Sequence, residues 1–158
     1  MLISTLLIVA AFAQTVESPF KPIAFLIGDW VGEGDGKPGE STGAFSFSLD
    51  LDKKIAIRKN HADLKDGVHD DLMIAYADPA GKGLRAIYFD NEGHVIAYSV
   101  ESIFDGVRFV SDASAPGPRF RLTYKKTGEK TVSIQFEIAA PGKPDAFAPY
   151  ITAKARKK

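Results

Sequence analysis

The alternation of apolar and polar residues along most of this chain constrains its fold more than any other feature. The stretch Phe-Ser-Phe-Ser-Leu-Asp-Leu at 45–51 places every apolar side chain on one face of an extended strand. Similar period-two stretches recur toward the C-terminus, whereas no helical spacing of apolar residues persists after residue 27. The pattern therefore predicts an all-β protein.

Turn residues separate the alternating segments at short intervals, as at Asn91-Glu92-Gly93 and Thr127-Gly128. Such short connections leave no room for crossover helices, so neighbouring strands should be antiparallel. A sheet of about ten strands in a small protein closes on itself, because closure removes its exposed edges. We therefore predict a closed, antiparallel, up-and-down barrel. Its strands should cover 30–36, 45–51, a segment that begins at 55, 72–76, 84–90, 95–100, 107–111, 120–126, 132–138 and 151–156.

A short helix is predicted before the barrel. Ser18 is suited to the N-cap and Pro19 to the first helical position, and the following apolar stretch, 20–27, ends at Gly28.

The N-terminus has the features of a secretory signal peptide. Residues 2–11 are mostly apolar but too few to span a bilayer, and Ala11-Phe12-Ala13 fits the small-residue cleavage pattern. No Lys or Arg precedes the apolar stretch. We expect residues 1–13 to be removed, residues 14–158 to form the barrel domain, and the mature chain to be periplasmic or secreted. No later apolar stretch is long enough for a stable membrane span.

Charge and cysteine content exclude several function classes. Twenty Lys and Arg residues balance twenty Asp and Glu residues, so there is no basic excess for binding nucleic acid. The absence of cysteine excludes a disulfide framework, a thiolate metal site and a cysteine nucleophile.

The start of the first predicted strand resembles a known family. Gly28-Asp29-Trp30, directly after a short helix, is similar to the G-x-W signature of lipocalins and the wider calycin group of barrels. The resemblance implies that Trp30 closes one barrel end and that a basic residue of the last strand lies across it. Arg156 is the matching residue, with Lys154 as the alternative.

The segment from Gly28 to Gly36 is also similar to the start of nitrobindin-like haem-binding barrels. The whole-chain pattern is closer to secreted bacterial proteins of unknown function with lipocalin-like barrels. Nitrobindin-like proteins hold haem iron through a histidine late in the chain, but the last histidine here is His94. We therefore expect no haem cofactor.

Three tyrosines are candidate ligand-binding residues, because each shares strand parity with apolar neighbours. Tyr76, Tyr88 and Tyr124 would point into the barrel if those apolar residues line it, and each hydroxyl could bind the polar end of a ligand. His61 has the parity of its apolar neighbours and would join them near a strand end. The alternative is that all four are ordinary core residues.

Two acidic and histidine-containing clusters leave other chemistries open. His69-Asp70-Asp71, and Asp90 with His94, combine carboxylate and imidazole groups, but neither has a spacing that identifies a metal site. Both clusters follow turn residues, so we expect them at loop tips, where polar groups are simply solvated. The alternative is that the hairpin ends lie at one mouth of the barrel and bring these residues together.

We expect an exported barrel that holds a small, largely apolar molecule without converting it. One alternative is an enzyme that uses the cavity, with His61, His94 or a nearby carboxylate as the base. Another is a fully packed barrel that acts as an interaction module.

Overall fold

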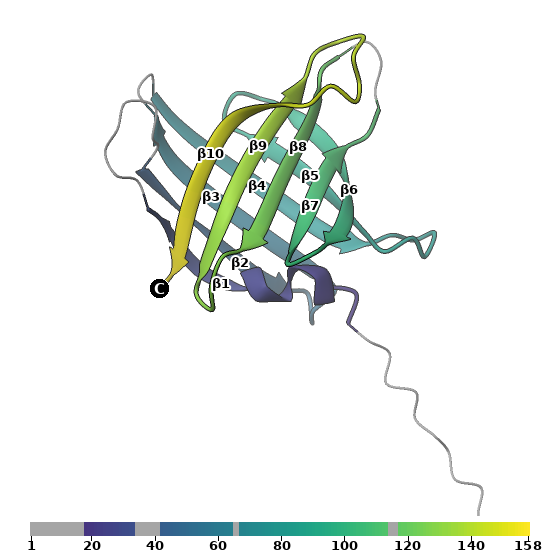
Figure 1. The fold of residues 1–158 in the computed structure, drawn as a ribbon. Helices are drawn as coiled ribbons and strands as arrows, with labels where there is room; N and C mark the ends of the chain where they lie inside the picture. The colour runs from purple at the N-terminus through teal and green to yellow at the C-terminus, as the bar shows by residue number, and fades with distance from the viewer. Residues whose placement is uncertain (1–17, 34–41, 65–66, 114–116) are drawn as a thin grey trace, which may run out of the picture.

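A computed structural model describes residues 18–33, 42–64, 67–113 and 117–158, and it shows a closed antiparallel barrel of ten strands (Figure 1). The predicted fold class is therefore confirmed, while the proposed signal peptide lies outside the described residues. The elements are η1 (Lys21–Leu26), β1 (Gly28–Gly32), β2 (Thr42–Asp50), β3 (Ile55–Leu64), β4 (Gly67–Ala77), β5 (Leu84–Asp90), β6 (Val95–Ile103), β7 (Gly106–Ser111), β8 (Arg119–Lys126), β9 (Thr131–Ala139) and β10 (Ala148–Lys157).

Each strand pairs with the next one along the chain, and β1 pairs with β10 to close the barrel. In this seam Trp30 lies opposite Lys157 and Val31 lies opposite Arg156. The seam joins the two ends of the domain, so β1 has a hydrogen-bonded partner on each side. The barrel consequently has no free edge strand among its ten strands.

The N-terminal helix is a 3-10 helix and not the longer helical segment that the sequence suggested. Ser18 accepts a hydrogen bond from the backbone N–H of Phe20 at 3.3 Å, and η1 then runs from Lys21 to Leu26. In a 3-10 helix, residues three apart lie above one another. Ile23 and Leu26 therefore share one face, and both are completely buried against the barrel. This face covers the end at which β1 begins (Figure 1).

A cluster of aromatic rings fills the covered half of the barrel. The Tyr124 ring lies at its centre, 5.6 Å from the Phe45 ring and 6.3 Å from the Phe109 ring. The facing strands β3 and β4 contribute smaller inward side chains, Ala56 and Ala75 among them. The small residues make room for the rings, so both walls contribute to one continuous core.

Trp30 is buried at the covered end and is held from three sides. Its ring stacks on Phe45 with centroids 5.7 Å apart, and its Nε1–H donates to the Leu26 carbonyl oxygen at 2.8 Å. The Nζ of Lys157 lies 5.6 Å from the ring centroid. The expected cation, Arg156, was the wrong residue: it is exposed and lies 3.8 Å from the Glu33 carboxylate. Alternate residues of a strand face opposite sides, and it is Lys157 that lies opposite Trp30.

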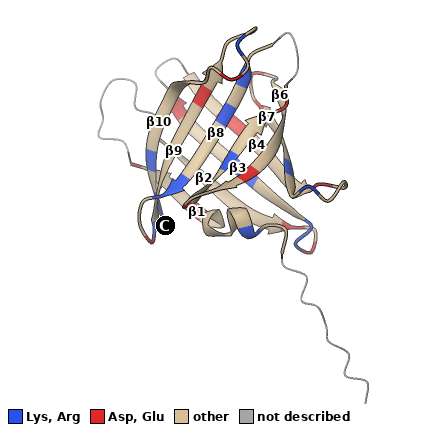
Figure 2. Cartoon of the chain, turned by 45° about the vertical axis from the view of Figure 1, so that its right-hand side comes forward, with Lys and Arg blue, Asp and Glu red and all other residues tan. Residues whose placement is uncertain are grey.

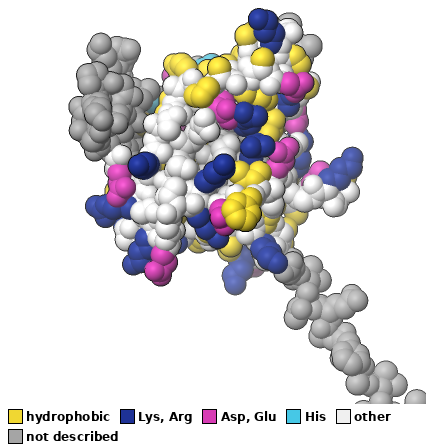
Figure 3. Space-filling view, viewed as in Figure 1, with side chains coloured by type: hydrophobic (Ala, Val, Ile, Leu, Met, Phe, Trp, Pro, Cys, Tyr) yellow, Lys and Arg dark blue, Asp and Glu magenta, His cyan; other side chains and the backbone are white. Residues whose placement is uncertain are grey.

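Charges of both signs are mixed over the parts of the outer surface that Figures 2 and 3 show. Lys and Arg are mixed with Asp and Glu over the wall and turns seen in Figure 2. On the face shown in Figure 3, hydrophobic side chains are scattered among charged ones. Neither view shows a large surface of one charge.

We predict that Trp30→Ala lowers the free energy of unfolding by about 3–5 kcal/mol, because it removes a fully buried indole. Lys157→Ala should cost about 0.5–1 kcal/mol through the lost cation–π contact. The two changes should be non-additive, since the groups touch. Urea unfolding measures all three values. Arg156→Ala is the control and should leave stability nearly unchanged. An effect of Arg156→Ala that exceeds that of Lys157→Ala would contradict this account.

Candidate functional site

Polar side chains line one wall of the barrel near the end opposite η1. They come from β3, β4 and β5, on the same strand faces as the buried residues Arg58 and Met73. Their Cα atoms follow the register Asn60, Asp71, Asp90 across the three strands. The remaining inward polar side chains of this wall are His69 and Tyr88.

Hydrogen bonds link this wall from the rim inward. The Tyr88 hydroxyl donates to Asp90 Oδ2 at 3.2 Å and lies 2.9 Å from His69 Nε2. A hydroxyl has only one hydrogen, so His69 Nε2 is the donor in the second contact. Asp90 also accepts from the His94 ring at 2.9 Å and from the His94 backbone N–H. Burial raises the pKa of Tyr88, and Asp71 and Asp90 add to the shift, so Tyr88 stays a neutral donor. The imidazoles of His69 and His94 are therefore connected through one phenol and one carboxylate.

A buried ion pair lies below this chain of hydrogen bonds. The Arg58 guanidinium bonds Asp71, and both side chains are buried. Asp71 Oδ2 also accepts from Asn60 Nδ2 at 3.0 Å. Burial raises the pKa of Asp71, although Arg58 and His69 oppose the shift. The Tyr124 hydroxyl faces Arg58 from the aromatic cluster without completing a hydrogen bond. The pair therefore separates the packed aromatic half from the polar wall above it.

The wall opposite the polar residues is apolar and is open to solvent. Phe120 and Phe136 stack with ring centroids 6.0 Å apart, and Ile134 lies on the same inward face of β9 as Phe136. Ile96 on β6 also points inward, but it lies directly beside Tyr88 at the edge of the polar wall. All four apolar side chains point inward but are only partly buried. Solvent therefore reaches the inside of this end, which has one polar and one apolar wall.

The structure separates the four predicted ligand-binding residues. Tyr88 and Tyr124 lie inside, Tyr88 in the polar wall and Tyr124 in the aromatic core. Tyr76 and His61 lie on the outside of β4 and β3. The His61 Nδ1 is 2.7 Å from the exposed Asp70 carboxylate, whose hydrogen bond raises the pKa of His61. These two residues are therefore not part of the interior site.

For β3 and β4, the prediction directed the wrong set of alternate residues into the barrel. The prediction placed the large aliphatic residues inside, but the buried residues are Ala56 and Arg58 on β3, and Met73 and Ala75 on β4. The Phe45 and Phe47 rings of the neighbouring β2 and the Tyr124 ring of β8 occupy the space that larger side chains would need. The isoleucines of β3 and β4 are consequently directed outward.

Sequence reasoning named His69, Asp71, Asp90 and His94 as two separate clusters, but it missed Arg58 and did not place these residues together in one wall. Arg58 and Asp71 were not considered as a pair, and His69 was placed at a solvated loop tip. The sequence did contain a pattern that could have identified the pair. Arg58 lies on the same side of its strand as Ala56, and Asp71 lies on the same side of its strand as Met73 and Ala75. A charged residue in a row of small inward residues needs an opposite charge on the neighbouring strand.

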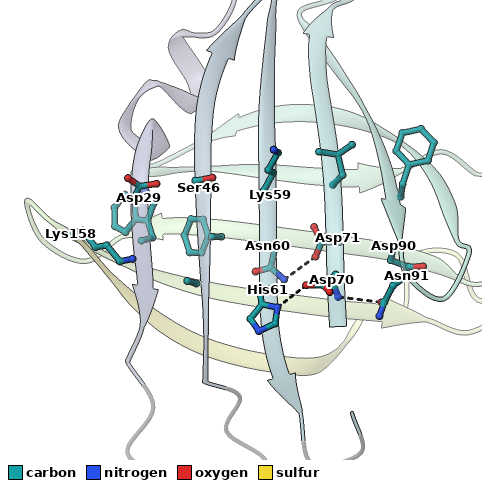
Figure 4. A pocket seen from close by; sticks show the side chains of 15 residues that line it. Asp29, Ser46, Lys59, Asn60, His61, Asp70, Asp71, Asp90, Asn91 and Lys158 are labelled. Carbon is teal, nitrogen blue, oxygen red and sulfur yellow. Dashed lines mark hydrogen bonds and ion pairs between the residues drawn. The ribbon is translucent and has the colours of Figure 1, made fainter. Parts of the chain in front are cut away.

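A second hollow lies on the outer surface, across β1 to β5 (Figure 4). It has a volume of about 660 Å³ and is open to solvent. The hollow runs along one register row of the sheet, formed by Trp30, Phe45, Asn60, Asp71 and Asp90. The side chains of this row point into the barrel, so the outward side chains on either side of the row form the two sides of the hollow. These outward residues include Lys59, His61, Asp70, Leu72, Phe89 and Lys158.

Comparisons with known proteins add no assignment: neither a protein-family model nor a curated protein matches the sequence. The closed barrel is compatible with a lipocalin-like fold. Within residues 18–33, 42–64, 67–113 and 117–158, no helix is long and apolar enough to cross a membrane. In the same residues, no three His, Asp or Glu side chains are grouped as metal ligands would be.

We predict that Asp71→Ala lowers the free energy of unfolding by about 3–5 kcal/mol, because it leaves the buried Arg58 without its counter-charge. The double variant Arg58→Met with Asp71→Leu should recover most of this loss. Asp112→Ala is the matched control: it removes the partly exposed partner of Arg85 and should cost less than about 1 kcal/mol. Urea unfolding at neutral pH compares the variants. Equal losses for Asp71→Ala and Asp112→Ala would refute the assigned role of the buried pair.

Proposed function

We propose that the chain is exported and binds a small amphipathic molecule in the open end of its barrel. The apolar body of the molecule packs against Phe120 and Phe136, and its polar head lies against Asn60, Tyr88 and Asp90. The observation that carries the proposal is the pairing of one apolar and one polar wall around the same solvent-accessible interior.

The packing of the barrel supports this position for the ligand. Rings fill the half next to η1, and the buried Arg58–Asp71 pair lies above them. In the open half, by contrast, inward-facing apolar side chains contact water. Transfer of such surface from water to a ligand is favourable by roughly 25 cal/mol per Å². A few fixed polar groups then orient the bound molecule.

The charges at this end favour a head group that donates hydrogen bonds. Asp90 lies in this wall, and Glu92 lies at the rim, 3.5 Å from the His69 ring. Arg58 is already paired with Asp71. A cationic or neutral donor therefore fits this wall better than a carboxylate.

Octylammonium and octanoate test the proposal as probes with the same apolar chain. We expect octylammonium to bind more tightly in isothermal titration calorimetry. Tyr88→Phe should weaken its binding about fivefold, which corresponds to one hydrogen bond of about 1 kcal/mol. Tyr76→Phe is the matched control, because its phenol lies on the outer surface, and it should have no effect. The proposal fails if neither amphiphile binds, or if both tyrosine variants weaken binding equally.

Export is tested by the N-terminus of the mature protein. The chain expressed with its own first residues in a bacterium should be recovered outside the cytoplasm and should begin at Gln14. Ala13→Arg should block processing, because the position before the cleavage site accepts only small residues. N-terminal sequencing and cell fractionation give the result. An intact N-terminus on exported wild-type chain would refute the assigned cleavage site.

Acid–base catalysis in the same open end is a second candidate function. The contact between His69 Nε2 and the Tyr88 hydroxyl favours it, since an imidazole linked to a phenol and a carboxylate can transfer protons. Of the two histidines that the sequence suggested as bases, His61 lies on the outer surface, whereas His94 reaches the wall through Asp90. Native mass spectrometry separates the two functions: a molecule recovered unchanged supports binding, and its conversion over time supports catalysis.

A further inference from the structure

The outer face of β3 to β6 is apolar although it lies on the surface of the barrel. Three rows of outward residues cross these strands in register, and the middle row is Ile57, Ile74, Ile87 and Ala97. The row beside it is Lys59, Leu72, Phe89 and Val95, and the third is Ile55, Tyr76, Arg85 and Ser99. We call this surface the apolar strip. Val95 is 67% exposed and Phe89 is 38% exposed.

Strands that are apolar on both faces are typical of sheets that are covered on both sides. The inner face of β4 is covered by the barrel core, through Met73 and Ala75. Its outer face, which carries Leu72, Ile74 and Tyr76, is covered by no described element of the barrel. The strip is therefore a surface built to be covered by a partner.

From this geometry we propose that the apolar strip binds the same strip on a second copy of the chain. A twofold symmetry axis relates the two copies. This axis runs parallel to the strands and passes between β4 and β5. This axis places β5 and β6 of one copy over β4 and β3 of the other. Phe89 then lies over Leu72 of the partner copy, and Val95 lies over its Lys59 at the border of the outer hollow. The proposal does not depend on the ligand-binding function.

Charge distribution favours a second copy over a membrane or a charged partner. The centre of the strip carries no charged residue, as is typical of the centre of an interface. Arg85 at one edge is already bound to Asp112 and Ser99. The adjoining hollow combines two lysines, Lys59 and Lys158, with two aspartates, Asp29 and Asp70, so its outward charges are mixed and do not favour a strongly charged partner. An anionic lipid surface would instead require a cluster of basic residues.

The size of the strip predicts a reversible dimer. Four strands about 4.8 Å apart and a length of about 20 Å give roughly 400 Å², and the adjoining hollow extends this to the order of 600 Å². Specific interfaces commonly bury about 800 Å² on each partner, and transient ones bury less. Association should therefore depend on concentration.

Sedimentation equilibrium over a concentration series from low micromolar to near millimolar tests the proposal. The wild-type chain should pass from monomer to dimer. Phe89→Lys and Val95→Lys should each keep it monomeric over the same series, because each buries a charge in the apolar contact. Phe104→Lys is the matched control: Phe104 is 90% exposed at the turn between β6 and β7, away from the strip, and this variant should dimerise like wild type. Circular dichroism and urea unfolding establish that each variant is folded.

A second measurement locates the contact independently of the lysine variants. The chain contains no cysteine, so Val95→Cys and Phe104→Cys each create a single site for a spin label. Labels at Val95→Cys should give a short, defined distance between copies, and labels at Phe104→Cys should not. A chain that stays monomeric throughout overturns the proposal. So does a dimer that Val95→Lys leaves intact, or binding of the monomer to anionic vesicles through the strip.

Discussion

The packing of aromatic rings against small residues across the barrel interior determines most of this structure. Ten strands enclose more space than backbone packing fills, so side chains must occupy it. Tyr124, Phe45 and Phe109 supply the volume from one side, while Ala56 and Ala75 on the other side leave room for it. Because the rings need that space, the larger residues of β3 and β4 are directed outward. The core therefore determines both what lies inside the barrel and what appears on its surface.

The buried Arg58–Asp71 pair marks the boundary between two halves with different tasks. On one side, Trp30, Leu26 and the rings form a dry core that stabilises the fold. On the other side, Tyr88 and its hydrogen-bond partners face the open end. A buried pair is a weak source of stability, because desolvation of both charges opposes their attraction. The pair instead holds neighbouring side chains in place. Asp71 also accepts a hydrogen bond from Asn60, and this contact orders the base of the polar wall.

The sequence was sufficient to predict the barrel, because alternation and turn residues are local signals that the whole chain repeats. It also placed Trp30 correctly at the start of β1. It did not identify Lys157, because choosing between adjacent residues of a strand requires the register of the β1–β10 seam. The same limit applies to His61 and Tyr76. On β3 and β4 both faces are apolar, so alternation alone does not tell the inner face from the outer one, and only the rings from other strands decide it.

The seam between β1 and β10 has a consequence for how the chain folds. Every other strand pairing joins neighbours in sequence and can form as soon as both strands are available. The seam instead joins residues 30–32 to residues 155–157, so loop-closure entropy over nearly the whole domain opposes it. Until the last strand is available, β1 and β9 each present an unpaired edge, and Lys157 cannot reach Trp30. A chain that is still being synthesised therefore holds an open sheet, which becomes a barrel only when β10 is available to pair with β1 and β9.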